Sequence, residues 1–266
     1  MTNSIAHIFL IGALNVGGLF FAMWVLHLFL KNAAVVDVGW GLGFILLCVQ
    51  YIIHGAGFNL RSTICFVMIF LWGMRIVLYL LKRFSAEKEE DKRYKKIRKE
   101  FGGAAWFKFL FIFEFQAALE MIIGIPLLIV SLNPAPGLSA VEISGIIIFA
   151  AALLGETLSD EQLHSFKQDP VNKGKVCDIG LWQYSRHPNY FFELMIWVGI
   201  FVFSLGSPMG WAGIVSPLVM FYLLMYVSGV PLAEEQSLLS RGDAYRKYQK
   251  TTSIFFPMPK KRMIEP

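Results

Sequence analysis

Residues 180–193, with the sequence GLWQYSRHPNYFFE, place an arginine, a histidine, a proline and an asparagine directly before an apolar run. Pro188 suits the first position of a helix, because a missing N–H and a fixed φ cost nothing there. The free N–H groups and the dipole of such a helix start favour a negative charge beside Arg186 and His187. The segment therefore predicts an anion site, and a plainer interpretation is a cationic membrane anchor followed by a helix cap.

Two helix faces near this segment carry polar side chains at successive turns. They are Glu156, Asp160, Leu163 and Lys167 on one face, and Asn189, Glu193 and Trp197 on the other. The basic loop of residues 172–175 joins the two helices. Amides and acids suit the hydroxyl and amide groups of a nucleotide, and cations at a rim suit phosphates. The two faces therefore predict a nucleotide-binding cleft.

The composition indicates an integral membrane protein that holds these faces in place. Of the 266 residues, 56% are hydrophobic and 16% are charged, which is too apolar for one soluble core. Seven apolar runs have about the length that spans a bilayer: residues 5–30, 35–53, 62–81, 106–132, 141–158, 190–205 and 211–232. The predicted fold is all-α, a single membrane domain of about seven transmembrane helices over residues 1–266.

Lysine and arginine are concentrated in alternate connections and in the C-terminal tail, and the other connections hold only Arg61. The positive-inside rule then places the N-terminus outside and the C-terminus in the cytosol. The net charge of +5 fits topology and lipid headgroups rather than nucleic acid. Residues 82–100 mix both charge signs, which predicts a short amphipathic helix on the membrane surface. No disulfide or metal site is expected, because the three cysteines lie in unrelated places.

Ionisable side chains inside apolar runs are costly in a bilayer, so each is a candidate for function. Structural roles remain open beside the functional ones. Arg75 is near enough to a span end to reach the interface, and Asp37 is placed to cap the second span. Gln116 and Glu120 lie one turn apart and are expected to bond neighbouring helices.

These motifs resemble the steroid 5α-reductase superfamily, in its broad bacterial branch that includes the DUF1295 proteins. The resemblance is carried by GLWQYSRHPNYFFE, by the stripe from Asp160 to Lys167 and by the tail DAYRKYQKTTSIFFP. It implies a seven-helix enzyme of the bacterial inner membrane. Residues 139–266 would enclose NADPH from the cytosolic side, and residues 1–132 would hold a hydrophobic lipid or steroid-like substrate.

The resemblance also implies which residues contact the cofactor. Seven of them match cofactor-contacting positions of steroid reductases: Asp160, Lys167, Asn172, Lys175, Asn189, Glu193 and Trp197. Arg75 and Tyr79 resemble a pair that contacts phosphate and nicotinamide. We add Arg186, His187 and Tyr190 from the helix-start motif, and Glu234, which stands where steroid reductases tend to carry a histidine.

The chemistry implied is hydride transfer to the β-carbon of a conjugated lipid enone, most simply a 3-oxo-Δ4 steroid, while a donor polarises the carbonyl oxygen. Steroid reductases carry a Gln-Glu pair early in the second span and a tyrosine three residues before the arginine of the third. This sequence departs at both, with Asp37 and Trp72 in their place. The Asp37 carboxyl, if burial raises its pKa, and the Trp72 indole N–H are the two candidate proton donors.

Two other functions remain open. A methyltransferase of the isoprenylcysteine carboxyl type shares the Arg-His-Pro-x-Tyr turn, but S-adenosylmethionine brings a sulfonium cation and no phosphate, which suits the basic residues poorly. A transporter would show paired Gly/Pro breaks inside its spans, whereas Pro126 and Pro217 stand isolated. An NADPH-dependent reductase is therefore the predicted function; the sequence is compatible with a monomer and does not fix the oligomeric state.

Overall fold

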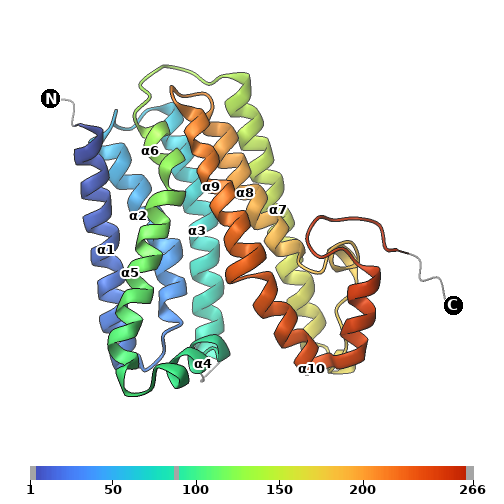
Figure 1. The fold of residues 1–266 in the computed structure, drawn as a ribbon. Helices are drawn as coiled ribbons and strands as arrows, with labels where there is room; N and C mark the ends of the chain where they lie inside the picture. Colours follow the sequence, from blue (N-terminus) through green and yellow to red (C-terminus); the bar gives the residue numbers. More distant parts are fainter. Residues whose placement is uncertain (1–3, 87–89, 262–266) are drawn as a thin grey trace. The chain divides into compact units, whose positions relative to one another are not determined.

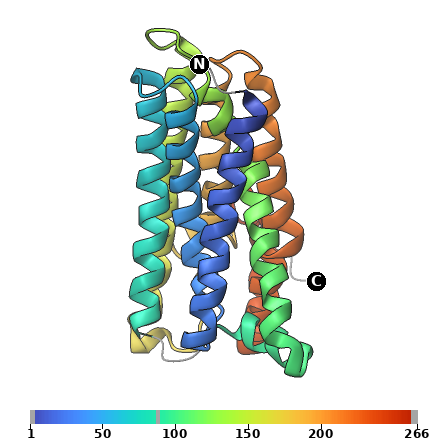
Figure 2. The ribbon, with the colours of Figure 1, turned by 90° about the vertical axis from the view of Figure 1, so that its left-hand side faces the viewer.

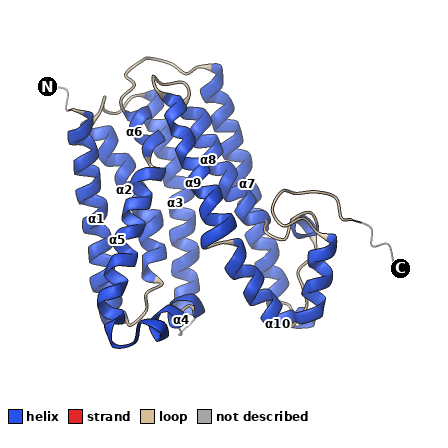
Figure 3. Ribbon diagram, in the orientation of Figure 1, coloured by secondary structure: helices blue, strands red, loops and turns tan. Residues whose placement is uncertain are grey.

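The computed structural model describes residues 4–86 and 90–261. Every regular element in those residues is a helix, and none is a strand (Figure 3). Predominantly apolar sequence favours this outcome, because a helix satisfies its own backbone hydrogen bonds where no water is available. The all-α prediction is confirmed.

Five helical segments of the described chain are long and apolar enough to cross a membrane. They are α1 (Ile5–Leu30), α2 (Val35–His54), α3 (Leu60–Ala86, of which Leu60–Lys82 qualifies), α7 (Ala140–Gln168) and the run Gly210–Thr251. A sixth arises if the bent pair α5 (Ala105–Ile123) and α6 (Ile125–Ser131) is one span. The remaining predicted span is α8 (Pro188–Ser204), an apolar helix of 17 residues. Pro188 is its first residue, as predicted.

The other elements are short or lie beyond the apolar runs. They are α4 (Lys92–Phe101), η1 (Gly102–Ala104), η2 (Pro170–Asn172), η3 (Gly180–Gln183), η4 (Gly210–Ile214), α9 (Val215–Tyr222), the π-helical turn η5 (Leu223–Val227) and α10 (Val230–Thr251). Helix α10 is kinked at Gly242, whose φ of 50° favours glycine.

The chain divides into two compact units. The first unit comprises residues 1–142 and 204–215, and the second comprises residues 143–203 and 216–266. In the first unit, α1, α2, α3 and α5 run side by side (Figures 1 and 2). Gly41 and Gly73 allow α2 and α3 to pack closely, because a Cβ on either would lie 2.8 Å from the carbonyl oxygen of the other.

Helix α4 forms the predicted short amphipathic helix, although residues 87–89 lie outside the described part of the chain. Its Tyr94 is buried, whereas Lys95, Lys96 and Lys99 are exposed. Arg98 of α4 pairs with Glu90 at 2.7 Å. Burial alone would raise the pKa of Glu90, but the hydrogen bonds from Arg98 and from the backbone N–H of Ala33 outweigh it and lower that pKa below its usual value.

The first unit contains a broken span. Helix α5 ends at Ile123, Gly124 separates the two helices, and α6, with Pro126 in its first turn, continues at an angle of 46°. Proline removes a backbone donor and disrupts the preceding turn, which accounts for the bend. Sequence analysis did not expect a break at Pro126, and the structure shows one there. The break does not pair Pro126 with Pro217, whose segment Gly210–Thr251 passes as one span, so the paired breaks of a transporter are not seen among the described residues.

In the second unit, α7 and α8 pack through glycine. A Cβ on Gly145 of α7 would lie 2.5 Å from the Phe203 backbone nitrogen, and one on Gly199 of α8 would lie 2.7 Å from that of Phe149. The two helix backbones are therefore in direct contact, which holds the polar faces further along both helices close together.

The first unit contains a buried ion pair formed by Arg61, the one lysine or arginine in the set of connections that is predicted to face the periplasm. Arg61 donates to both oxygens of Glu142, and also to the carbonyl oxygens of Ala135 at 2.6 Å and Gly137 at 3.0 Å. The two side chains are 4% and 0% exposed. Removing one partner would leave a buried charge uncompensated.

We predict that Arg61→Met destabilises the protein by about 3–5 kcal/mol, the cost of breaking a buried pair. The measurement is the thermal unfolding midpoint in detergent. Arg246→Met is the matched control, because the Arg246–Asp243 pair is 70% and 93% exposed and should change stability by less than about 1 kcal/mol. Equal midpoints for the two variants would contradict the structural role of Arg61.

Candidate functional site

The two predicted polar faces meet in the second unit. Nδ2 of Asn189, in the first turn of α8, donates to Oδ1 of Asp160 on α7 at 3.3 Å. The other amide atom of Asn189, Oδ1, is buried and has no hydrogen-bond partner among the described residues. Buried polar atoms are nearly always paired, so this oxygen is an unused hydrogen-bond acceptor at the place where the two faces meet.

Glu193 and Trp197 continue the same face of α8. The Trp197 indole N–H donates to Glu193 Oε1 at 3.0 Å, one helical turn away. Both side chains are buried, with Glu193 8% and Trp197 0% exposed. The predicted inward orientation of this face is confirmed, because all three predicted residues lie on the packed side of α8.

Glu234 of α10 occupies the anion site predicted beside Arg186 and His187. Its carboxylate accepts hydrogen bonds from four side chains: Arg186, His187, Tyr245 and Gln249. The Arg186 Nε lies 2.8 Å and the His187 Nε2 lies 2.9 Å from Oε1. The negative charge favoured by the helix start is therefore supplied by the protein itself.

Arg186 is almost fully used by these contacts. Beyond Glu234, its Nη1 donates to the carbonyl oxygens of Gln249 at 3.0 Å and Thr252 at 2.8 Å. These bonds, with two to Glu234, occupy four of the five N–H donors of a guanidinium. One N–H donor of Arg186 remains unused. The predicted contact between Arg186 and a cofactor phosphate could therefore involve only that donor.

The C-terminal segment is fastened to the same turn. The backbone N–H of Arg186 donates to the carbonyl oxygen of Ser253, and the Ser185 hydroxyl donates to that of Phe255. The Tyr248 hydroxyl of α10 contacts the carbonyl oxygens of Trp182 and Ser185. His187 stacks on Tyr190 with ring centroids 5.5 Å apart. The turn before α8 is therefore rigid on both sides.

Sequence analysis missed three residues of this cluster. Tyr245, Tyr248 and Gln249 lie on one face of α10, at spacings of three and four residues. The helical spacing of these residues in the polar tail was the signal that could have found them. Two tyrosines and an amide on one face of a helix indicate that this face packs against another part of the protein.

The basic loop acquires a further cation from α10. Arg241 donates through Nε to the carbonyl oxygen of Lys175 at 2.9 Å. Lys167 and Arg241 both act electrostatically on the Cys177 thiol, and burial raises the pKa of that thiol. Cys177 is therefore a poor nucleophile, whereas the loop and α10 gather positive charge around it.

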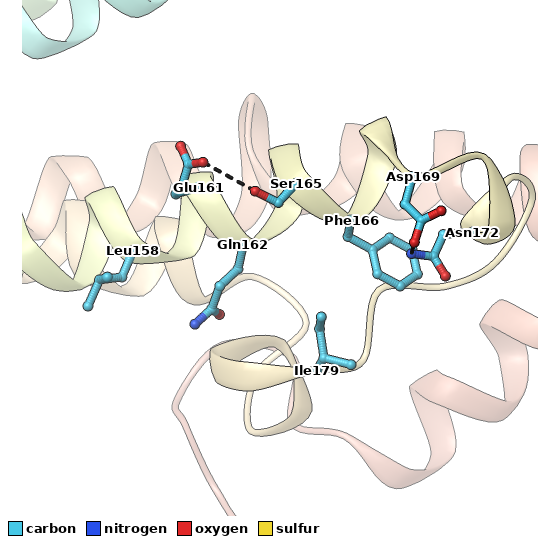
Figure 4. A pocket seen from close by; sticks show the side chains of 8 residues that line it. All are labelled: Leu158, Glu161, Gln162, Ser165, Phe166, Asp169, Asn172 and Ile179. Atoms are coloured by element: carbon cyan, nitrogen blue, oxygen red, sulfur yellow. Dashed lines mark hydrogen bonds between the residues drawn. The ribbon is translucent and has the colours of Figure 1, made fainter.

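A groove of about 390 Å³ lies along another face of α7 (Figure 4). Its lining comprises Leu158, Glu161, Gln162, Ser165, Phe166, Asp169, Asn172 and Ile179. Gln162 Oε1 accepts from the Leu181 N–H at 2.8 Å, and Asn172 lies 3.5 Å from Asp169. The lining contains no cation and, of the predicted cofactor residues, only Asn172, so this groove does not correspond to the predicted cleft.

Four predicted site residues belong to the first unit. Asp37 accepts from Arg93 Nη2 at 2.9 Å and from the Tyr94 hydroxyl at 2.7 Å. Trp72 is fully buried and packs edge-on against Phe44. Arg75 and Tyr79 lie one turn apart on α3, with Arg75 half-buried and Tyr79 exposed.

Comparisons with known proteins show the family to which the chain belongs. The family described as "Protein of unknown function (DUF1295)" matches residues 23–252, so the chain belongs to it, as predicted. An uncharacterized protein of Schizosaccharomyces pombe is 24% identical, over 88% of this chain and 75% of that protein. A probable O-methyltransferase of Ustilaginoidea virens is 45% identical over 47 residues, which are 18% of this chain and 16% of that relative. No solved structure matches the chain.

We predict that Glu234→Gln weakens the attachment of residues 252–256 to the turn before α8. Loss of the carboxylate charge leaves Arg186, 9% exposed, without its counter-ion, at a cost of about 3–5 kcal/mol. Hydrogen exchange of residues 252–256 should become faster, and the thermal midpoint should fall. Glu235→Gln, at the exposed neighbouring position, is the control; a tail equally protected in both variants would show that Glu234 does not hold it.

Proposed function

We propose that this member of the DUF1295 family is a membrane-embedded, NADPH-dependent reductase that saturates the conjugated C=C bond of a lipid enone. The observation that carries the proposal is the contact between Asp160 and Asn189, with a buried amide oxygen left over. An unpaired buried acceptor costs about 1–3 kcal/mol. An amide or amino group of a nucleotide would remove that cost, which supports a cofactor at this face.

The cations of the second unit suit the phosphates of such a cofactor. Lys167 and Lys175 are exposed, and Arg241 is bonded to the carbonyl oxygen of Lys175. Ammonium and guanidinium groups bind phosphate oxygens by charge-assisted hydrogen bonds. These three residues, more than Arg186, are the proposed phosphate contacts.

NADPH, when bound, supplies the hydride for the β-carbon of the enone. The chain's own part is to hold the cofactor, exclude water and deliver a proton. Asp37 and Trp72 remain the proposed donors, with different parts: the Trp72 indole N–H can polarise the carbonyl oxygen without releasing its proton. Asp37 accepts from Arg93 and Tyr94, so it must first take up a proton from solvent, to which its side chain is 22% exposed, before it can deliver one.

An S-adenosylmethionine-dependent membrane methyltransferase is the second candidate. The relative named as a probable O-methyltransferase supports it over the 47 matched residues. Neutralisation of Arg186 by Glu234 supports it too, because it removes one of the cations that oppose a sulfonium group. The phosphate-binding cations that remain favour the reductase.

The proposed setting is the bacterial inner membrane, with the N-terminus periplasmic and the C-terminus cytoplasmic. The asymmetry of lysine and arginine supports this orientation. The substrate is a hydrophobic lipid of steroid or isoprenoid type, reached through the bilayer.

We predict that NADPH raises the thermal midpoint of the purified protein more than NADH does, and that S-adenosylmethionine leaves it unchanged. Asn189→Ala and Glu193→Ala should each weaken NADPH affinity about tenfold or more, the factor that one hydrogen bond of about 1.4 kcal/mol represents. Gln168→Ala, at an exposed position of α7, is the control. Stabilisation by S-adenosylmethionine alone would establish the methyltransferase instead.

The proposed orientation predicts opposite labelling of two loops. In a background without native cysteines, Lys173→Cys should react with a membrane-impermeant thiol reagent only after the cytosolic side is opened. Gly137→Cys should react in intact cells, because residue 137 lies in a connection that the proposed orientation places on the periplasmic side. The reverse pattern would invert the topology.

A further inference from the structure

Glu120 of α5 is a buried carboxyl group that the proposed site does not use. Its side chain is 0% exposed. Neither carboxyl oxygen has a hydrogen-bond partner among the described residues. The expected role of bonding neighbouring helices is therefore not observed, and Gln116, one turn earlier, does not satisfy it. A group of this kind is rare in folded proteins.

The carboxyl group lies against the backbone of α2. A Cβ added to Gly43 would overlap its Oε2, Cδ and Oε1 atoms. Glycine at this position leaves room for the carboxyl group and brings no side chain that could bond to it. The contact is therefore close and yet leaves the hydrogen-bonding capacity of Glu120 unused.

The broken span lies one turn further along. The carbonyl oxygen of Glu120 accepts from Gly124 N–H at 2.7 Å, and the 46° bend to α6 begins there. Irregular backbone at membrane depth persists where it is enclosed by protein or lines a binding space. The unpaired carboxyl group of Glu120 and the break in the helix are therefore two independent irregularities, one turn apart, in the first unit.

The surroundings decide the chemical form of Glu120. An ionised carboxylate without a partner would be far more costly to bury than a neutral carboxylic acid. A bound cation is not indicated, because the described residues contain no group of three His, Cys, Asp or Glu side chains that could hold a metal. A neutral carboxylic acid has one O–H to donate, and its missing partner is an uncharged acceptor.

We propose that Glu120 is protonated in the folded protein and donates its O–H to the carbonyl oxygen of a lipid bound in the first unit. The inference rests on the proposed function for the nature of that lipid, an enone. It assigns to Glu120 the polarisation of the carbonyl oxygen, which the sequence analysis expects of Asp37 or Trp72, and leaves proton delivery to Asp37. A hydrogen bond from a neutral acid strengthens as the oxygen gains enolate charge.

Infrared difference spectroscopy on the lipid-reconstituted protein tests the protonated state. Glu120→Gln should remove one C=O band of a protonated carboxylic acid from the wild-type spectrum, whereas Glu114→Gln, the control on the same helix, should leave that band in place. Addition of a 3-oxo-Δ4 steroid should shift the band. An analogue without the 3-oxo group should not. The proposal would be overturned if Glu120→Gln removed no such band, or if the band that it removes did not respond differently to the two probes.

Affinity for the same two probes provides the second test. The wild type should bind the 3-oxo steroid about tenfold more tightly than the analogue, the ratio expected for one hydrogen bond. Glu120→Leu should abolish this preference, and Glu120→Gln, which keeps an N–H donor, should retain part of it. Both variants should fold, because neither buries a new unpaired charge. A preference unchanged in Glu120→Leu would refute the role.

NADPH-induced stabilisation of the same variants separates this inference from the proposed function. If Glu120→Leu loses probe discrimination and the wild type is not stabilised by NADPH, the reductase fails and the carbonyl contact stands. If NADPH stabilises both proteins equally and the probes are not distinguished by the wild type, the carbonyl contact fails and the cofactor site stands.

Discussion

The carboxylate of Glu234 is the interaction on which the second unit depends. It accepts hydrogen bonds from Arg186, His187, Tyr245 and Gln249, and so joins the turn before α8 to the amphiphilic helix α10. A guanidinium that is 9% exposed requires a counter-ion, and a carboxylate in the same place requires donors. The Arg186 guanidinium and the Glu234 carboxylate each offset the desolvation cost of the other. Because Arg186 lies directly before α8, this ion pair fixes the beginning of α8 and the position of Asn189.

The polar face that starts at Asn189 is the part of the molecule best suited to ligand chemistry. Asp160, Asn189, Glu193 and Trp197 lie together on packed helix surfaces, whereas the open groove on α7 has acidic and apolar walls and no cation. Membership of a family without an assigned function leaves the choice of cofactor to physical reasoning. The exposed cations Lys167 and Lys175, together with Arg241, are the reason why we propose a phosphorylated dinucleotide rather than a sulfonium compound.

The first unit combines close helix packing with costly buried groups. Glycines at α2 and α3 bring backbones into contact, and Arg61 pairs with Glu142 where a connection enters the bundle. Asp37 is held by Arg93 and Tyr94 of α4, which links the surface helix to the start of α2. Glu120 is different, because it is buried beside a helix break without any such partner. Polar groups that the fold does not satisfy are the strongest indication of ligands in this unit.

Local sequence was sufficient for the all-α fold, most span boundaries, the start of α8 at Pro188 and the inward face from Asn189 to Trp197. These features depend on hydrophobic length and on the 3.6-residue period, which act within one helix. Tertiary structure alone decided that Glu234 neutralises Arg186, that Arg241 joins the basic loop and that Asp37 is ion-paired with Arg93. Those outcomes depend on which side chains meet across dozens of residues, and the energy of a charge or a buried carboxyl group is set by that partner and not by its neighbours in the chain.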